Sequence, residues 1–99
     1  MYLEIATLEV KAGLEAEFEA GVEKATVFFR RAKGCKGMEL RRSKEYPSRY
    51  RFLVKWDDVE DHLVHFRNSG DFQEFRALVG HCFDGAPEVE HTTEVLKAF

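Results

Sequence analysis

The chain has 99 residues, of which 44% are hydrophobic and nine are phenylalanine, so it can fold around one modest core as a single domain spanning residues 1–99. It carries 15 basic and 18 acidic residues and a net charge of -3, which leaves no excess of positive charge for a nucleic-acid backbone. We therefore expect no nucleic acid among its partners, and so many phenylalanines in a short chain indicate a surface that a second copy covers.

The first segment, Tyr2 to Val10, is rich in β-forming residues and alternates along its length as a strand does. A helix is predicted after Gly13, because apolar residues recur at helical spacing and form one stripe. Acidic residues gather at its start and basic residues at its end, which suits the helix dipole, and Gly34 ends it. The stripe consists of Leu14, Phe18, Gly21, Val22, Ala25, Phe28, Phe29 and Ala32.

Two strands are predicted next, "CKGMELRRS" at 35–43 and "RYRFLVKW" at 49–56. The segment "KEYPS" separates them, and its Pro47 and Ser48 suit a turn and not a central strand. The two strands therefore form an antiparallel hairpin.

Two short helices follow, from Asp58 to about Arg67 and from Asp71 to about Phe83, with the breaker "NSG" between them. Ser69 or Asp71 is available as the N-cap of the second helix. After the "DGAP" turn, a last strand is predicted from about Val89 to Leu96.

This order, β-α-β-β-α(α)-β, predicts an α+β fold of the ferredoxin-like type, with a four-stranded antiparallel sheet and helices on one face. The other sheet face is then uncovered, although Leu3, Ile5 and Leu53 make it partly apolar. An exposed apolar sheet face marks an interface. We therefore expect a homodimer in which two sheets pack face to face and close an α+β barrel.

Cys35 and Cys82 lack the spacing of a metal site and are predicted to be reduced, buried thiols. The N-terminal segment has no basic start followed by an apolar run, and no stretch approaches the roughly 18 apolar residues of a membrane span. These patterns predict a soluble, cytoplasmic protein with no membrane partner.

Residues 55–75 concentrate the side chains that could carry chemistry. At about 100° per residue, Val59, Leu63 and Phe66 share the core-facing side of the first short helix. His62 and His65 lie with Asp58 on its flank, where they could bind a metal or pair as base and orienting group. A solvated flank is the favoured interpretation, because a structural metal site needs four ligands and no second cluster is apparent.

Arg76 lies within the apolar arc of the second short helix, between Phe72 and Val79. Its guanidinium either extends outward to solvent or a dimer partner, or points into a cavity where it meets an anion. Trp56 ends a strand, and a lone tryptophan is more often a core residue than a site residue. The chain has no phosphate loop, nucleophile elbow or dinucleotide fingerprint, so flavin and nicotinamide cofactors are not expected.

Residues 34–91 resemble the antibiotic biosynthesis monooxygenase family. The resemblance rests on the strand start "GCKG", a strand-ending Trp, a helix that contains His, the pattern S-x-x-F at 69–72 and the closing P-x-V-x-H at 87–91. It covers nearly the whole chain once the first strand and helix are included. It implies a homodimeric α+β barrel with a pocket in each subunit between sheet and helices.

The resemblance also implies an activity. Cofactor-independent members of the family oxidise electron-rich phenols or quinols with dioxygen, and a base, a cation and a dry pocket suffice for this chemistry. The Trp and Arg that line the site in anthrone-oxidising members match Trp56 and Arg76 here. A His found on the first short helix of quinol-oxidising relatives matches His65.

Several positions depart from the family pattern. Phe52 stands where anthrone-oxidising members have an Asn, and His62 stands where they have a Tyr. Asp71 replaces a His of the quinol-oxidising relatives. Ala6 and Arg76 occupy the places of the Asn and the axial His of the haem-degrading branch, so haem degradation is not expected.

The leading hypothesis is a homodimeric monooxygenase that needs no metal or flavin and acts on a small aromatic, phenol-like substrate. Arg76 would stabilise the substrate anion, and His62 or His65 would take the proton. Phe52, Trp56, Phe66 and Phe72 would shape the substrate pocket. The alternative is a non-catalytic dimeric barrel that binds a small ligand or serves as a stress-related module.

Overall fold

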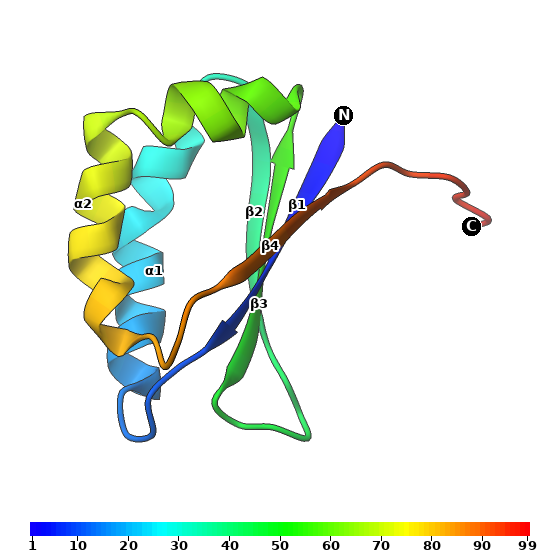
Figure 1. Cartoon of the computed structure of the whole chain (residues 1–99). Helices are drawn as coiled ribbons and strands as arrows, with labels where there is room; N and C mark the ends of the chain where they lie inside the picture. The colour runs from blue at the N-terminus through cyan, green and yellow to red at the C-terminus, as the bar shows by residue number, and fades with distance from the viewer.

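Four antiparallel strands form one sheet in the order β2-β3-β1-β4, in a computed structural model that describes residues 1–99. The strands are β1 (Tyr2–Glu9), β2 (Cys35–Arg42), β3 (Arg49–Trp56) and β4 (Glu88–Thr92). The helices are α1 (Glu15–Arg30), the π-helical turn η1 (Asp61–Phe66), α2 (Gly70–Val79) and the 3₁₀ turn η2 (Gly80–Cys82). Both α1 and α2 cover the same face of the sheet (Figure 1). The predicted ferredoxin-like order of elements is therefore confirmed.

The core lies between this helix layer and the sheet. Tyr50, Phe52, Val54 and Trp56 alternate along β3 and are all buried, as the period of a strand predicts. From α1, Phe29 contacts the rings of Phe52, Phe66 and Phe75 at centroid distances of 5.2, 4.6 and 5.1 Å. This aromatic contact joins α1 to β3, η1 and α2.

The two helices approach each other closely at Gly21. A Cβ atom at this position would lie 2.9 Å from the Val79 side chain, so only glycine fits without a shift of α2. Ser69 is the N-cap of α2 and accepts a hydrogen bond from the backbone N–H of Phe72, as one of the two capping predictions stated.

The first short helix differs from the prediction. It forms a π-helical turn in which the Arg67 N–H bonds to the His62 carbonyl at 3.0 Å. In this wider turn, residues four and five apart share a face, so Asp61 and His62 are buried together with Phe66. Leu63 is instead exposed. The prediction that His62 lies on a solvated flank and Leu63 in the core is wrong for this reason.

The last strand is also shorter than predicted. β4 ends at Thr92, which pairs with Leu3 near the start of β1, and a longer β4 would run past the end of its partner strand. Residues 93–99 extend away from the sheet (Figure 1). Three apolar residues of this segment, Val95, Leu96 and Phe99, are almost fully exposed.

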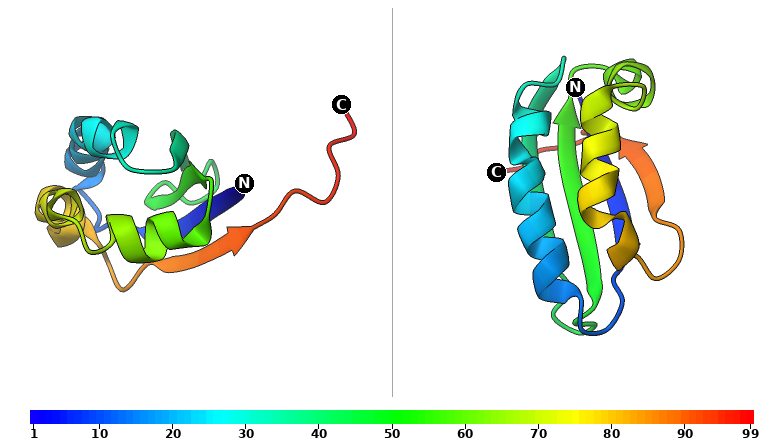
Figure 2. Two further views of the ribbon diagram at one scale, coloured as in Figure 1. Left: turned by 90° about the horizontal axis from the view of Figure 1, so that it is seen from above. Right: turned by 90° about the vertical axis from the view of Figure 1, so that its left-hand side faces the viewer.

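The second sheet face has no helix over it (Figure 2). By strand register it presents Leu3, Ile5 and Leu53 among charged residues, and these three are half-buried. None of the helices combines the length and the hydropathy needed to cross a bilayer.

Candidate functional site

A cavity of about 310 Å³ lies between the sheet and the helix layer. Its size falls in the range of small-molecule sites, and ten of its 16 lining residues are hydrophobic, so it suits an apolar or aromatic ligand. The lining comprises Glu4, Ala6, Leu8, Phe29, Phe52, His62, Phe66, Arg67, Phe72, Phe75, Arg76, Val79, Gly80, Phe83, Pro87 and Val89.

Aromatic rings form much of the cavity wall. Phe66 and Phe72 meet at a ring-centroid distance of 5.8 Å, and Phe52 stacks on Phe75 at 5.8 Å. The structure thus places three of the four predicted pocket residues, Phe52, Phe66 and Phe72, around one space.

A carboxyl group from the sheet and an imidazole from η1 meet at the cavity lining. Glu4 projects from β1 on the same face as Ala6 and is 5% exposed. His62 projects from η1 and is 4% exposed, and its Nδ1 lies 3.5 Å from the Glu4 Oε1. The π-helical turn carries His62 inward, so the two groups meet beside the cavity.

Trp56 contacts both Glu4 and His62 and fixes their positions. Its indole N–H donates a hydrogen bond of 2.9 Å to Glu4 Oε1, and its ring stacks on the His62 ring at 5.3 Å with an interplanar angle of 12°. Trp56 is completely buried and does not line the cavity. Trp56 was predicted to shape the pocket directly, but it contacts the lining residues Glu4 and His62 and not the cavity itself.

His91, on β4, extends the pair into a row of three groups. Its Nε2 lies 2.9 Å from the His62 Nδ1, so one of the two nitrogens donates a hydrogen bond to the other. β4 places His91 opposite Glu4 on β1, which explains how a residue 29 positions from His62 reaches it.

Burial changes the acidity of all three groups. Desolvation raises the pKa of Glu4 to about 7, although the Trp56 hydrogen bond and the charge of Arg67 oppose the shift. Desolvation lowers the pKa of His62 to about 4, with His91 and Arg67 adding to the effect. The pKa of His91 also falls, first because of burial and then because of Arg67. Near neutral pH, the site thus contains a carboxyl group that can accept or release a proton beside a neutral imidazole.

Two guanidinium groups lie at the cavity. Arg76 from α2 and Arg67 next to η1 line it, and both side chains are exposed in the single chain. No carboxylate forms an ion pair with either of them. They are available to an anionic ligand group.

His65 is placed differently from His62. Its side chain is exposed and does not line the cavity, although sequence reasoning treated the two histidines as equal candidates. The structure brings His62 and Arg76 to one space and leaves His65 outside it.

Sequence reasoning missed Glu4, His91 and Arg67. A signal for Glu4 was present, because it alternates with Ala6 and Leu8 on one face of the first strand, and a carboxyl group on an apolar face is unusual. His91 closes the P-x-V-x-H pattern at 87–91, but that pattern does not place it beside His62, because its position depends on strand pairing. No local pattern marks Arg67, which follows the π-helical turn.

A larger hollow of about 510 Å³ lies along α1 and β2. Its acidic and basic residues are exposed, and only five of its 12 lining residues are hydrophobic. The charged residues are Glu19, Glu23, Arg30, Lys36 and Glu39. It lacks the buried ionisable pair of the first cavity, which remains the candidate site.

Comparison with known proteins identifies the family of the chain. The family model described as antibiotic biosynthesis monooxygenase matches residues 1–78. An uncharacterised protein of Bacillus subtilis, YczJ, is 37% identical over 95 residues, which cover 96% of this chain and 100% of YczJ.

Solved structures share the fold closely. A Bordetella bronchiseptica protein that carries the provisional name antibiotic biosynthesis monooxygenase is 52% identical with a TM-score of 0.94, over 96% of this chain and 97% of that protein. SnoaB of Streptomyces nogalater, a cofactor-independent oxygenase, has a TM-score of 0.84 at 18% identity, over 98% of this chain and 95% of SnoaB.

Proposed function

This chain belongs to the antibiotic biosynthesis monooxygenase family, and we propose that it is a cofactor-independent monooxygenase that oxidises a small aromatic substrate with dioxygen. The substrate would be a phenol, an anthrone or a quinol. The observation that carries the proposal is the composition of the cavity lining. Phenylalanine rings line it together with the buried pair of Glu4 and His62 and the guanidinium of Arg76. SnoaB, which shares the fold at 18% identity, is a cofactor-independent oxygenase.

The chemistry needs no external reductant. A methylene carbon beside a phenol ring can become a carbonyl by giving four electrons to dioxygen, with one oxygen atom entering the product and the other leaving as water. The first step is removal of a proton, because the resulting anion can pass an electron to dioxygen. The protein must therefore supply a base, stabilise the anion and exclude water.

The residues of the cavity fit these roles. His62 is neutral at physiological pH and takes the substrate proton, and the Glu4 carboxylate beside it accepts or shares that proton. Arg76, which also lines the cavity, stabilises the anion. Phe52, Phe66 and Phe72 hold the aromatic ring, and Trp56 orients His62 and Glu4.

The working form would be a homodimer that uses the open sheet face. Strand register places basic residues (Arg41, Arg49, Arg51, Lys55) and acidic residues (Glu9, Glu39, Glu88, Glu90) on this face, and a two-fold axis could pair them with their opposites. The Nη1 atom of Arg51 is buried on this face without a hydrogen-bond partner in its own chain, which a second copy could supply. The exposed apolar segment at 95–99 would then pack on the partner.

The test is dioxygen consumption by the purified, metal-stripped protein with a panel of hydroxyanthrones and hydroquinones. We expect uptake above the spontaneous rate, a loss of roughly 100-fold in His62→Ala as is typical for a lost general base, and a comparable loss in Arg76→Ala. Arg30→Ala is the matched control, because Arg30 is also an exposed arginine but lies outside this cavity. His65→Ala distinguishes the two histidines and should retain activity.

No uptake with any substrate of the panel would contradict the proposal. If the same compounds bind and are released unchanged, the alternative of a non-catalytic barrel that binds a small ligand is correct. Equal activity in Arg76→Ala and Arg30→Ala would remove Arg76 from the site.

A further inference from the structure

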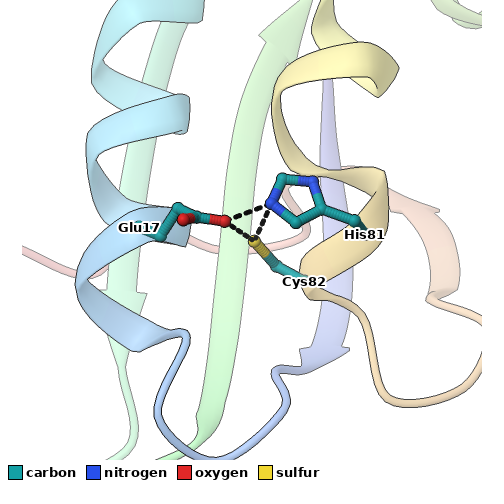
Figure 3. Close-up of side chains that lie close together, drawn as sticks. All are labelled: Glu17, His81 and Cys82. Carbon is teal, nitrogen blue, oxygen red and sulfur yellow. Dashed lines mark hydrogen bonds and ion pairs between the residues drawn. The ribbon is translucent and has the colours of Figure 1, made fainter.

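A second cluster of reactive side chains lies outside the candidate active site. Glu17 of α1 faces His81 and Cys82 of η2 (Figure 3). The donor atoms of the three residues all lie within 4.8 Å of one another. None of the three lines the 310 Å³ cavity, and the proposed oxygenase chemistry does not use them.

The backbone around the cluster is fixed by contacts on several sides. Cys82 is completely buried, and its carbonyl accepts a hydrogen bond of 2.8 Å from the Lys11 N–H. The next residue, Phe83, forms a β-bridge with Val10, and its ring lies 6.0 Å from that of Phe18, which follows Glu17 in α1. Elements far apart in sequence are thus held at a set distance before any ligand binds, which favours a preorganised site.

The donor atoms converge on one point and do not form a relay. Both the Cys82 Sγ and the Glu17 Oε2 contact the same nitrogen of His81, Nε2, with the sulfur at 3.5 Å. In a catalytic Cys-His-acid arrangement, the acid would hold the ring through the other nitrogen. Three lone-pair donors around one small space are instead the arrangement of a metal site.

The spacing between sulfur and nitrogen suits a tetrahedral ion. Bonds of about 2.3 Å to sulfur and about 2.0 Å to nitrogen would hold the two donors about 3.5 Å apart. The observed Sγ to Nε2 distance is 3.5 Å, and the Sγ to Oε2 distance is 3.9 Å. The side chains of His81 and Glu17 are 54% and 56% exposed, so rotation of either can open the contact between them to admit an ion.

We propose that Glu17, His81 and Cys82 bind a divalent transition-metal ion of the zinc type. The combination of thiolate, imidazole and carboxylate favours Zn²⁺ or Co²⁺ over Mg²⁺ and Ca²⁺, which prefer oxygen ligands. Binding replaces the thiol proton, which passes to solvent, and changes no oxidation state. Three protein ligands leave a fourth position that faces solvent between Glu17 and His81.

The ion would connect the start of α1 to the end of the helix that borders the cavity. Val79, Gly80 and Phe83 line the cavity on either side of His81 and Cys82. A bound metal would therefore hold this part of the cavity wall against α1. The inference is independent of the proposed oxygenase function, because it rests on residues outside the cavity.

The test is titration of the chelator-treated, reduced protein with Co²⁺. We expect one ion per chain, a thiolate-to-cobalt charge-transfer band in the near ultraviolet, displacement of Co²⁺ by Zn²⁺, and a rise in Tm with Zn²⁺. The absence of both the band and the Tm rise would overturn the proposal.

Variants locate the site. His81→Ala and Glu17→Gln change exposed side chains and should keep the fold, but should weaken binding by roughly tenfold or more. Cys82→Ser should abolish the band.

Cys35→Ser and His65→Ala are the matched controls, because they remove a thiol and an imidazole outside the cluster. Both variants should bind the metal as the wild type does. Unchanged affinity in His81→Ala, or loss of the band in Cys35→Ser, would assign the metal elsewhere and refute the proposal.

Discussion

The carboxyl group of Glu4 is buried with no lysine or arginine in ion-pair contact, which explains why its pKa rises despite the hydrogen bond from Trp56. The same desolvation lowers the pKa of His62. Near pH 6 both groups are therefore neutral, and the cavity wall avoids a buried charge. Of the two groups, Glu4 has a pKa close to physiological pH, so its carboxyl group is the one suited to accept and release a proton there.

This acidity predicts how stability depends on pH. The folded pKa of Glu4, about 7, exceeds the unfolded value of 4.5, so the folded state holds an extra proton between these values and loses stability as pH rises through 7. Glu4→Gln keeps an acceptor for Trp56 but cannot ionise. From pH 5 to pH 8, the free energy of unfolding of Glu4→Gln should rise relative to wild type by up to about 3 kcal/mol.

Urea denaturation at the two pH values measures this difference, and the His62 contribution largely cancels because both proteins contain it. Glu74→Gln, which changes an exposed carboxyl group on α2, is the control and should show no such trend. A pH-independent difference between wild type and Glu4→Gln would mean that Glu4 is solvated.

At this scale, the sequence predicts the side chains that belong to strong local patterns. Phe52, Phe66, Phe72 and Arg76 line the cavity, and their roles there stay predictions. His62 lines it as well, although helical periodicity places it on a solvated flank. His91 could not be found, because it reaches His62 only through the pairing of β1 with β4. The sequence predicts that Glu4 shares a strand face with Ala6 and Leu8, but it does not predict that this face is the one that the helices cover.

Among the elements, η1 decides the geometry of the site, because its π-helical turn buries Asp61 and His62 together. Sequence periodicity assumes an ordinary helix and therefore assigned His62 to the flank. Strand β3 and helix α1 were predictable, since long apolar patterns specify them. The π-helical turn was not, because it depends on tertiary contacts such as that between Asp61 and Gly34.

Gly34 allows this contact. It has a φ of +77°, and a Cβ atom there would lie 2.0 Å from the Asp61 Oδ2. Gly34→Ala should therefore lower the free energy of unfolding by clearly more than the roughly 1 kcal/mol of backbone strain alone, and should displace His62. Thermal or urea unfolding measures the loss.

Gly13→Ala is the matched control, because Gly13 has a φ of +93° but no atom within 4 Å of an added Cβ. The difference between the two variants isolates the contact with Asp61. Equal losses for the two variants would show that Asp61 moves aside without cost and does not fix η1.

For the whole molecule, the uncovered sheet face and the extended segment after β4 are the features that a single chain leaves without partners (Figure 2). Sequence patterns predicted the fold and the three apolar residues of this face, but strand register places these three among eight charged residues. They could not predict that β4 stops at Thr92, because β1 offers no partner residues beyond Tyr2. A second copy on this face would explain both features.

The dimer proposal predicts the effect of a charge at the centre of this face. Leu53→Glu should convert a dimer into a monomer in light scattering, because two buried carboxylates would face each other across the two-fold axis. Leu63→Glu, on the exposed side of η1, should leave the dimer intact. A monomeric wild type, or dissociation by both variants, would contradict the proposed interface.

In the proposed reaction, the cavity between sheet and helices incorporates oxygen from dioxygen into an aromatic substrate. The most direct measurement is turnover of an active hydroxyanthrone or hydroquinone under ¹⁸O₂, with mass spectrometry of the product from wild type, His62→Ala and Arg30→Ala. We predict one labelled oxygen atom per product molecule, formed at the wild-type rate by Arg30→Ala and at a far lower rate by His62→Ala. Product oxygen derived from water, or labelling that is no faster than without protein, would overturn the proposed oxygenase function.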